Sequence, residues 1–433
     1  MKRIFIVASL AIMAIGCQKT EIQNEIQNQI GFSTETGKQT RAIVDGTTYN
    51  ENQPFGVIAY GYQMEPNATE RTANTTSTPM DNIEISKVGG KWRATGEIVY
   101  YWPNDPRTKL DFYAYSPAQP KNGNANTPLP AHQELTGTIS HSEKESAEDD
   151  EYGLVLSGYE HTNMYVDFMV ADPVVGATYA NQLSNRENGV VVLNFRHEMT
   201  QINFVVKLDA VETVEDEVVV GVNDKYPNVD FTIKSIVLNN VVSGATYAYN
   251  DPNFSTSGLK WTPTDAAIAD YKIYPATSEP APNTGTYLNS YGAPGLTNEA
   301  ASGIEKTVVL RTDKSTRADV QEGEHCPGHK FSTTPVTMIP QAWVDANLQS
   351  FTIVYEISGT GVAKEEIVKT FAFNSSTPAP NWIANKKLTY TLTIGLNEIT
   401  FSPTVVDWSD DEGAYYNPVN IAPSTPSNGG TGN

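Results

Sequence analysis

The chain has 433 residues, enough for two or three domains of ordinary size, and its formal net charge is -21. This acidic balance argues against nucleic acid as a partner, because the phosphate backbone is also negative. Only two cysteines are present, Cys17 and Cys326, whereas tyrosine, phenylalanine, glycine and proline are abundant. The composition favours short strands separated by turns and held by packed cores, without disulfides.

Residues 1–17 have the pattern of a bacterial lipoprotein signal. Lys2 and Arg3 precede an apolar run, Ile4–Ile15, that is too short to span a membrane stably. Small residues then lead to Cys17, whose thiol can carry a diacylglycerol. We therefore predict export and lipidation at Cys17, with lipid as the only membrane anchor. A plain secretory signal cut nearby is the alternative.

Strand signals dominate the chain after a polar tether at residues 18–29. Apolar residues alternate or run together, with turn residues between the runs. In the first half the predicted strands are 30–34, 55–60, 97–103, 110–115, 165–171, 190–197 and 201–208. The polar stretch 118–151 is predicted to be a surface excursion.

The second half repeats this style. Its predicted strands include 230–238, 306–310, 336–339, 351–357, 366–373 and 388–394, with residues 399–406 following. Short helices are predicted at 143–151 and 340–346, and a disordered tail at 423–433. These patterns predict an all-β fold of two tandem antiparallel β-sandwiches, residues 42–208 and 209–422, joined at about 208–228.

No catalytic constellation is recognisable. The segment Glu322–His329 gathers carboxylate, imidazole and thiol groups, but its spacing matches no closed four-ligand pattern. His197, at the end of an apolar strand, is predicted to make a buried polar contact. We therefore expect no catalytic residue, no metal and no cofactor. A hydrolase remains an alternative, because its paired carboxylates need not be close in sequence.

Several ordered motifs give the chain a family resemblance. They are the lipoprotein signal through Cys17, Ile30–Phe32, Thr40–Ala42, Phe55–Ala59, Tyr100–Pro103, Leu110–Pro117, Asp167–Ala171, Val192–His197, Leu388–Ile394 and Val405–Trp408. In this order they resemble the fimbrillin family, the lipoprotein precursors of type V pili. The resemblance implies two transthyretin-like β-sandwich domains and a structural role in adhesion.

The same resemblance implies an assembly route. The lipoprotein would reach the outer membrane, where an arginine-specific protease would cut between Arg41 and Ala42. Residues 18–41, with the plug side chains Ile30 and Phe32, would be lost, and the product would enter an extracellular fimbrium. Other pilus subunits would then supply a strand to the vacated groove.

The C-terminal part supplies a candidate donor strand, although it contains a proline. Tyr415, Val419 and Ile421 would be its pocket-filling side chains, while Pro418 cannot donate a hydrogen bond to a strand ladder. A tip position, with a receptor on a host or bacterial surface, is the alternative to a shaft position. A different class of function is a permanently anchored surface lipoprotein that binds glycan or a host protein through aromatic residues in loops.

Overall fold

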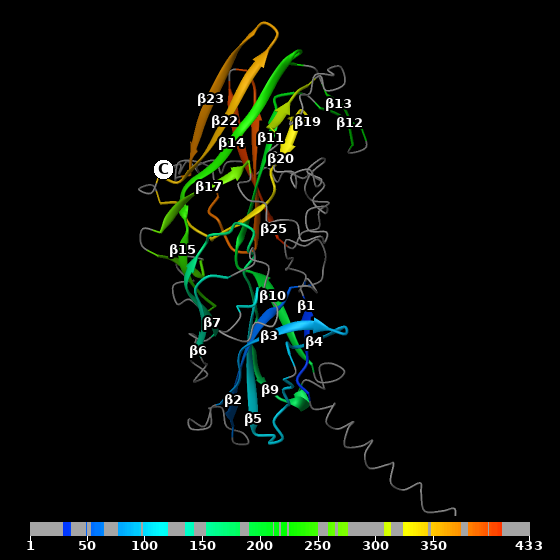
Figure 1. Cartoon of the computed structure of the whole chain (residues 1–433), viewed down its shortest axis with the longest axis vertical. Helices are drawn as coiled ribbons and strands as arrows, with labels where there is room; N and C mark the ends of the chain where they lie inside the picture. Colours follow the sequence, from blue (N-terminus) through cyan, green and yellow to red (C-terminus); the bar gives the residue numbers. More distant parts are fainter. Residues whose placement is uncertain are drawn as a thin grey trace, which may run out of the picture.

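The computed structural model describes residues 29–35, 49, 53–64, 77–96, 98–119, 135–142, 153–181, 190–210, 212–215, 218–222, 225–249, 259–264, 267–275, 307–312, 324–344, 348–373, 380–396 and 398–408. Over these residues the protein is elongated and almost entirely β, with one helical turn at 179–181 (Figure 1). The predicted all-β class is confirmed. No helix in this part of the chain is long and apolar enough to cross a membrane.

The lower half of the molecule in Figure 1 is an eight-stranded sheet that closes on itself. Around the circuit its strands are β2 (Phe55–Gln63), β3 (Ser77–Val88), β4 (Lys91–Ala94), β1 (Phe32–Glu35), β10 (Val191–His197), β8 (Met169–Ala171) and β5 (Thr108–Ser116), with β9 (Val174–Ala177) beside β5. Pairing of β5 with β2 completes the circuit. Closure matters because an open sheet edge is a template for pairing with another chain.

Strands β2 and β5 form the centre of this half because both of their faces are buried. Phe55 and Val57 point into the core of the closed sheet, whereas Ile58 joins a second core on the outer face. In β5, Phe112 faces the inner core and Tyr113 the outer one. This explains why the two segments are continuous apolar runs and do not alternate with polar residues.

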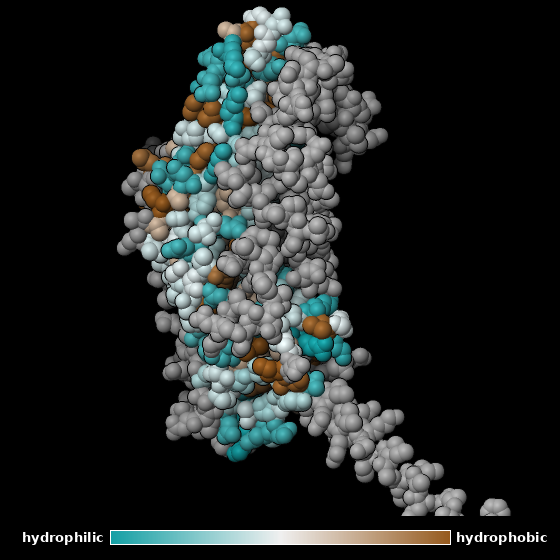
Figure 2. Space-filling view, in the orientation of Figure 1, coloured by the Kyte–Doolittle hydropathy of each residue, from teal (hydrophilic) through white to brown (hydrophobic). Residues whose placement is uncertain are grey.

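The upper half is a sandwich of two sheets around one core. The five-stranded sheet contains β20 (Lys330–Ser332), β21 (Val336–Met338), β11 (Thr200–Leu208), β24 (Lys386–Ile394) and β25 (Ile399–Asp407). The six-stranded sheet contains β19 (Glu324–Gly328), β18 (Thr307–Leu310), β17 (Ile268–Tyr274), β14 (Val229–Val242), β22 (Ser350–Gly359) and β23 (Val362–Ala372). Phe204 and Phe351 meet edge to face across the core, with centroids 5.2 Å apart. Near its upper tip hydrophilic residues lie among others of intermediate and hydrophobic character (Figure 2).

A four-stranded sheet forms the waist between the halves. It consists of β6 (Thr138–Ser142), β7 (Gly153–Glu160), β15 (Gly244–Ala248) and β16 (Trp261–Pro263), and β12 (Glu212–Glu215) with β13 (Val218–Val222) makes a separate hairpin. Pairing of β7 with β15 unites strands from either side of the predicted boundary at residue 208. That boundary stays a prediction, although β11, which precedes it, pairs only with upper-half strands in the described structure.

Two local predictions are wrong. Residues 98–103 form no strand beyond an isolated bridge at Tyr101, since their apolar side chains do not alternate between two faces and Pro103 lacks an amide donor. Residues 340–344 form no helix; Gln341 instead pairs with Trp382 through two backbone hydrogen bonds of 2.9 Å. Among the strands that the structure describes, three pairs are parallel, β1–β10, β11–β24 and β18–β19, within otherwise antiparallel sheets.

Candidate functional site

The most distinctive feature of the lower half is the way β1 completes its sheet. β1 runs parallel to β10, with Phe32 opposite Val191 and Glu35 opposite Asn194. On its other side Phe32 lies opposite Trp92 of β4. Within the described residues, β4 and β10 are connected through the sheet on this side only by β1. Withdrawal of β1 would therefore leave two strand edges facing one groove.

Side chains of β1 and of the segment just before it also fill the core under that groove. Ile30 is 7% exposed and Phe32 is 5% exposed, and both belong to the lower core. The ring of Phe32 packs edge to face against Phe55 and Phe112, with centroids 6.2 and 5.9 Å apart. Burial of two such side chains stabilises the closed sheet by about 4 kcal/mol. The sequence pattern predicted a first strand over residues 30–34; Phe32 does begin β1, whereas Ile30 lies two residues before that strand.

The segment before β1 is held by a second backbone contact. The amide of Ile30 donates to the carbonyl of Tyr100 at 2.8 Å, and Gln29 bridges Tyr101. The apolar side chains of Ile98, Val99 and Tyr101, in the segment that Ile30 and Gln29 contact, are 48–58% exposed and are called the lip below. An apolar lip therefore stands beside the start of β1, where sequence analysis predicted an ordinary strand.

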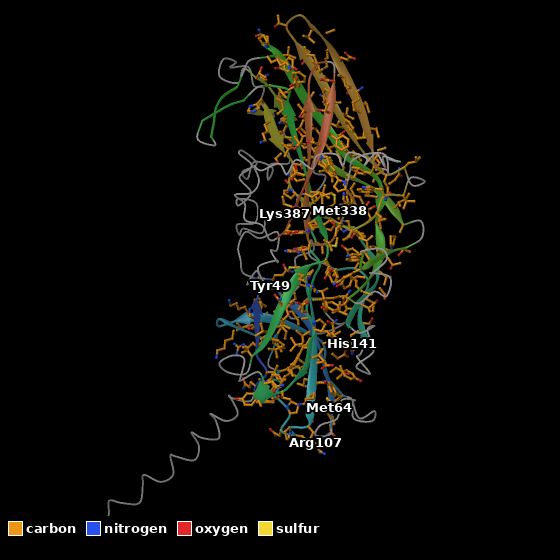
Figure 3. The ribbon with its side chains drawn as sticks, turned by 180° about the vertical axis from the view of Figure 1, so that it is seen from behind. Tyr49, Met64, Arg107, His141, Met338 and Lys387 are labelled. Atoms are coloured by element: carbon orange, nitrogen blue, oxygen red, sulfur yellow. The ribbon has the colours of Figure 1, made fainter. Side chains whose placement is uncertain are left out.

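Tyr49 and Trp92 complete the floor of the groove, and no sequence motif predicted a role for either of them. Tyr49 is 2% exposed, and its hydroxyl donates to Ser116 Oγ at 2.7 Å. Its ring packs against Trp92 and Phe195, with centroids 5.5 and 4.9 Å away. Figure 3 shows Tyr49 beside the first strand. No local signal marks it, because its sequence neighbours are polar.

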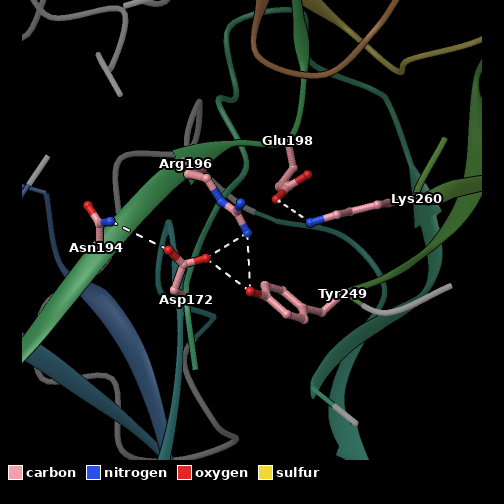
Figure 4. Close-up of polar contacts among 6 residues, drawn as sticks. All are labelled: Asp172, Asn194, Arg196, Glu198, Tyr249 and Lys260. Carbon is pink, nitrogen blue, oxygen red and sulfur yellow. Dashed lines mark hydrogen bonds and ion pairs between the residues drawn. The ribbon is translucent and has the colours of Figure 1, made fainter. Parts of the chain in front are cut away.

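A polar network ties the lower half to the waist (Figure 4). Arg196 of β10 makes an ion pair of 2.7 Å with Asp172 and donates to the Tyr249 hydroxyl at 3.2 Å. Tyr249 in turn donates to Asp172 at 2.9 Å. Burial, with the Asp172 carboxylate beside it, raises the pKa of Tyr249, so this hydroxyl remains a donor at neutral pH.

A second ion pair, between Lys260 and Glu198, extends this network to the start of β16. Lys260 pairs with Glu198 at 3.3 Å, and its ammonium lies 4.5 Å from the centre of the Tyr249 ring. The indole of Trp261 donates to the Glu198 carbonyl at 2.6 Å. The lower half is therefore joined to the waist by ion pairs, a cation–π contact and hydrogen bonds.

His197 makes the buried polar contact predicted for it. It is 1% exposed, and its Nδ1 donates to Asp167 Oδ2 at 2.8 Å. A second histidine, His161, has both ring nitrogens bonded: Tyr159 donates to Nδ1 at 2.9 Å, and Nε2 donates to the Thr337 carbonyl at 2.8 Å. His161 thus has both ring nitrogens in hydrogen bonds, whereas the buried Nε2 of His197 has no hydrogen-bond partner among the described residues.

The other predicted site residues lie outside the described part of the chain. They are Cys17, Arg41, Ala42, Tyr415, Val419 and Ile421. Their roles in lipidation, processing and strand donation therefore stay predictions. Among the residues whose placement is described, no group of three or more histidine, cysteine, aspartate or glutamate side chains could hold a metal ion.

Comparison with known proteins identifies the family. The sequence model described as fimbrillin-like matches residues 40–408. Among solved structures, a fimbrial protein from Bacteroides vulgatus is 16% identical, with 88% of this chain and 99% of that chain covered and a TM-score of 0.48. A candidate cell adhesion protein from Bacteroides uniformis is 14% identical, with 88% and 98% covered and a TM-score of 0.40.

No curated protein matches the chain. The assignment therefore rests on the family model, which spans most of the sequence. Because the match runs from residue 40 to Trp408, it includes every described strand after β1. On this ground the chain belongs to the fimbrillin-like family.

Proposed function

We propose that the protein is a structural subunit of a fimbrium, exported as a lipoprotein through Cys17 and assembled by strand addition after cleavage behind Arg41. The single observation that supports this most is the placement of β1. It precedes Arg41 in sequence, it is not part of the region matched to the family, and it occupies the gap between β4 and β10.

Cleavage would act through the sheet edges. Loss of β1 would expose the inward edges of β4 and β10 and the apolar floor around Phe55, Trp92 and Phe112. Unpaired backbone amides and carbonyls next to apolar pockets are what an incoming strand recognises. Under this proposal the donor would be a strand from another subunit, with residues 415–421 as the segment this chain would offer.

The test is direct. The purified full-length chain is incubated with an arginine-specific protease, and the new N-terminus is sequenced while polymers are followed by non-denaturing electrophoresis. We expect a start at Ala42 and a ladder of polymers, both absent from Arg41→Ala; Arg41→Lys, which keeps the charge, is the matched control. Assembly by the alanine variant would refute the processing step. An acylated chain that stays monomeric on the cell surface would favour a resident lipoprotein that binds glycan or a host protein.

A further inference from the structure

We propose that the groove under β1 selects its strand by a three-residue pattern: a branched aliphatic residue, then glycine, then an aromatic residue. The inference rests on the proposed function, because it concerns the strand that takes the place of β1. The pattern comes from the way Ile30, Gly31 and Phe32 fit this groove, and each position imposes a different requirement.

The third position requires an aromatic ring. Phe32 lies between Val191 and Trp92 in register and makes edge-to-face contacts with both Phe55 and Phe112. Such contacts need a flat ring with a positive edge and a negative face, which an aliphatic side chain lacks. A smaller residue would also leave a cavity lined by these rings.

The middle position favours glycine for a steric reason. Gly31 does not have a positive φ, so its backbone conformation is open to any residue. A Cβ placed there would, however, lie 3.3 Å from Val190 Cγ1. The Gly31 carbonyl accepts a hydrogen bond of 2.9 Å from the amide of Val191, so the backbone cannot retreat without losing that bond. Alanine needs a small shift of Val190, and a branched side chain needs a larger one.

Ser33, the residue after Phe32, indicates that β1 itself is not the tightest-binding strand for this groove. Ser33 lies opposite Val192, and its hydroxyl is buried without a hydrogen-bond partner among the described residues. A buried hydroxyl with no partner costs free energy that a methyl group does not. A strand with alanine here should therefore bind at least as tightly as β1, as expected of a plug that must later be replaced.

The occupant we infer is a strand from a partner subunit that carries this pattern. The segment Tyr415–Ile421 of the present chain has no glycine between two bulky apolar residues. It should therefore fit this groove less well than β1 does, so polymers of this chain alone would be held more weakly than contacts with a partner subunit that carries the pattern. The first position is less restrictive, because Ile30 is buried and its amide is held by Tyr100, but its side chain makes no directional contact.

The test uses the full-length chain with a recognition sequence for a specific protease in place of residues 36–40, so that it does not depend on Arg41. After cleavage, uptake of fluorescent peptides spanning residues 27–37 is measured by fluorescence anisotropy. We expect Gly31→Val and Phe32→Ala peptides to bind at least about tenfold more weakly than the unaltered peptide, and Ser33→Ala to bind equally or more tightly.

Two further peptides test whether the order of the residues, and not only their composition, determines binding to the groove. The composition-matched control exchanges Gly31 and Phe32, which moves the ring to the outward face, and it should bind at least about tenfold more weakly. A peptide spanning residues 411–423 should also rank below the unaltered one. The inference is overturned if the exchanged peptide or Gly31→Val binds within about threefold of the unaltered peptide, or if no peptide is taken up. Polymer formation after cleavage at Arg41 is a separate readout, so the proposed function can fail or survive independently.

Discussion

His197 and Trp408 stack face to face, with ring centroids 4.0 Å apart and ring planes inclined by only 2°. His197 ends β10 in the lower half, whereas Trp408 follows β25 in the upper half. Trp408 is fully buried in the waist core together with Ile58 and Tyr115. The last described residue is thus anchored at the waist.

This stack should be a major link between the halves. Trp408→Ala removes a fully buried indole and should lower the free energy of unfolding by about 4 kcal/mol. Trp408→Phe keeps a ring over His197 and should cost about 1.5 kcal/mol, because the indole N–H has no hydrogen-bond partner to lose in the described structure. Urea unfolding of the full chain measures both. A loss below about 1 kcal/mol for the alanine variant would contradict the role of the stack.

The strands that the sequence predicted best are those with one buried face. In β10, alternate residues from Val191 to His197 are buried, and β24 alternates over much of its length, as its threonines indicate. Local alternation was enough to find these strands. In contrast β3 was missed, because only Met80 and Ile85 of its twelve residues are buried and polar residues fill the rest.

Pairing between distant segments could not be predicted. Thr200 in β11 lies beside Lys386 in β24, and this parallel register continues to Leu208 beside Ile394. No local pattern specifies which strand pairs with which. The same limit applies to the site: alternation found Ile30 and Phe32, but only the fold shows that Tyr49 and Trp92 lie beneath them.

Phe32 should determine how firmly β1 is held before cleavage. In the uncleaved chain, Phe32→Ala should lower the free energy of unfolding by about 3 kcal/mol and speed hydrogen exchange of the β10 amides paired with β1. Val88→Ala, on β3 and 45% exposed, is the control and should cost less than about 0.5 kcal/mol. Unchanged exchange of the amide of Leu193 in Phe32→Ala would show that β1 is held by other contacts.

His161 should make stability fall in acid. Burial lowers the pKa of His161 from 6.5 to about 4 in the folded protein, so between these values only the unfolded chain takes up the proton. Its contribution is present above pH 6.5 and is lost as the pH falls to about 4, by about 3 kcal/mol in total. Unfolding of the parent and of His161→Gln is compared at pH 7 and pH 4.5. The variant should lose less stability over this interval; an equal loss would assign the acid sensitivity to other groups.

The two ion pairs of the waist network should differ in strength because they differ in exposure. Glu198 is 4% exposed and Lys260 is 16% exposed, so Glu198→Ala leaves a partly buried ammonium without its carboxylate and should cost about 3 kcal/mol. Asp172 and Arg196 are 42% and 34% exposed, and water screens them, so Asp172→Ala should cost about 1 kcal/mol. Urea unfolding distinguishes these values. Replacing Lys260 by methionine in the Glu198→Ala background should restore part of the loss, because the stranded charge is removed. Equal costs for the two alanine variants would mean that burial does not set the strength of these pairs.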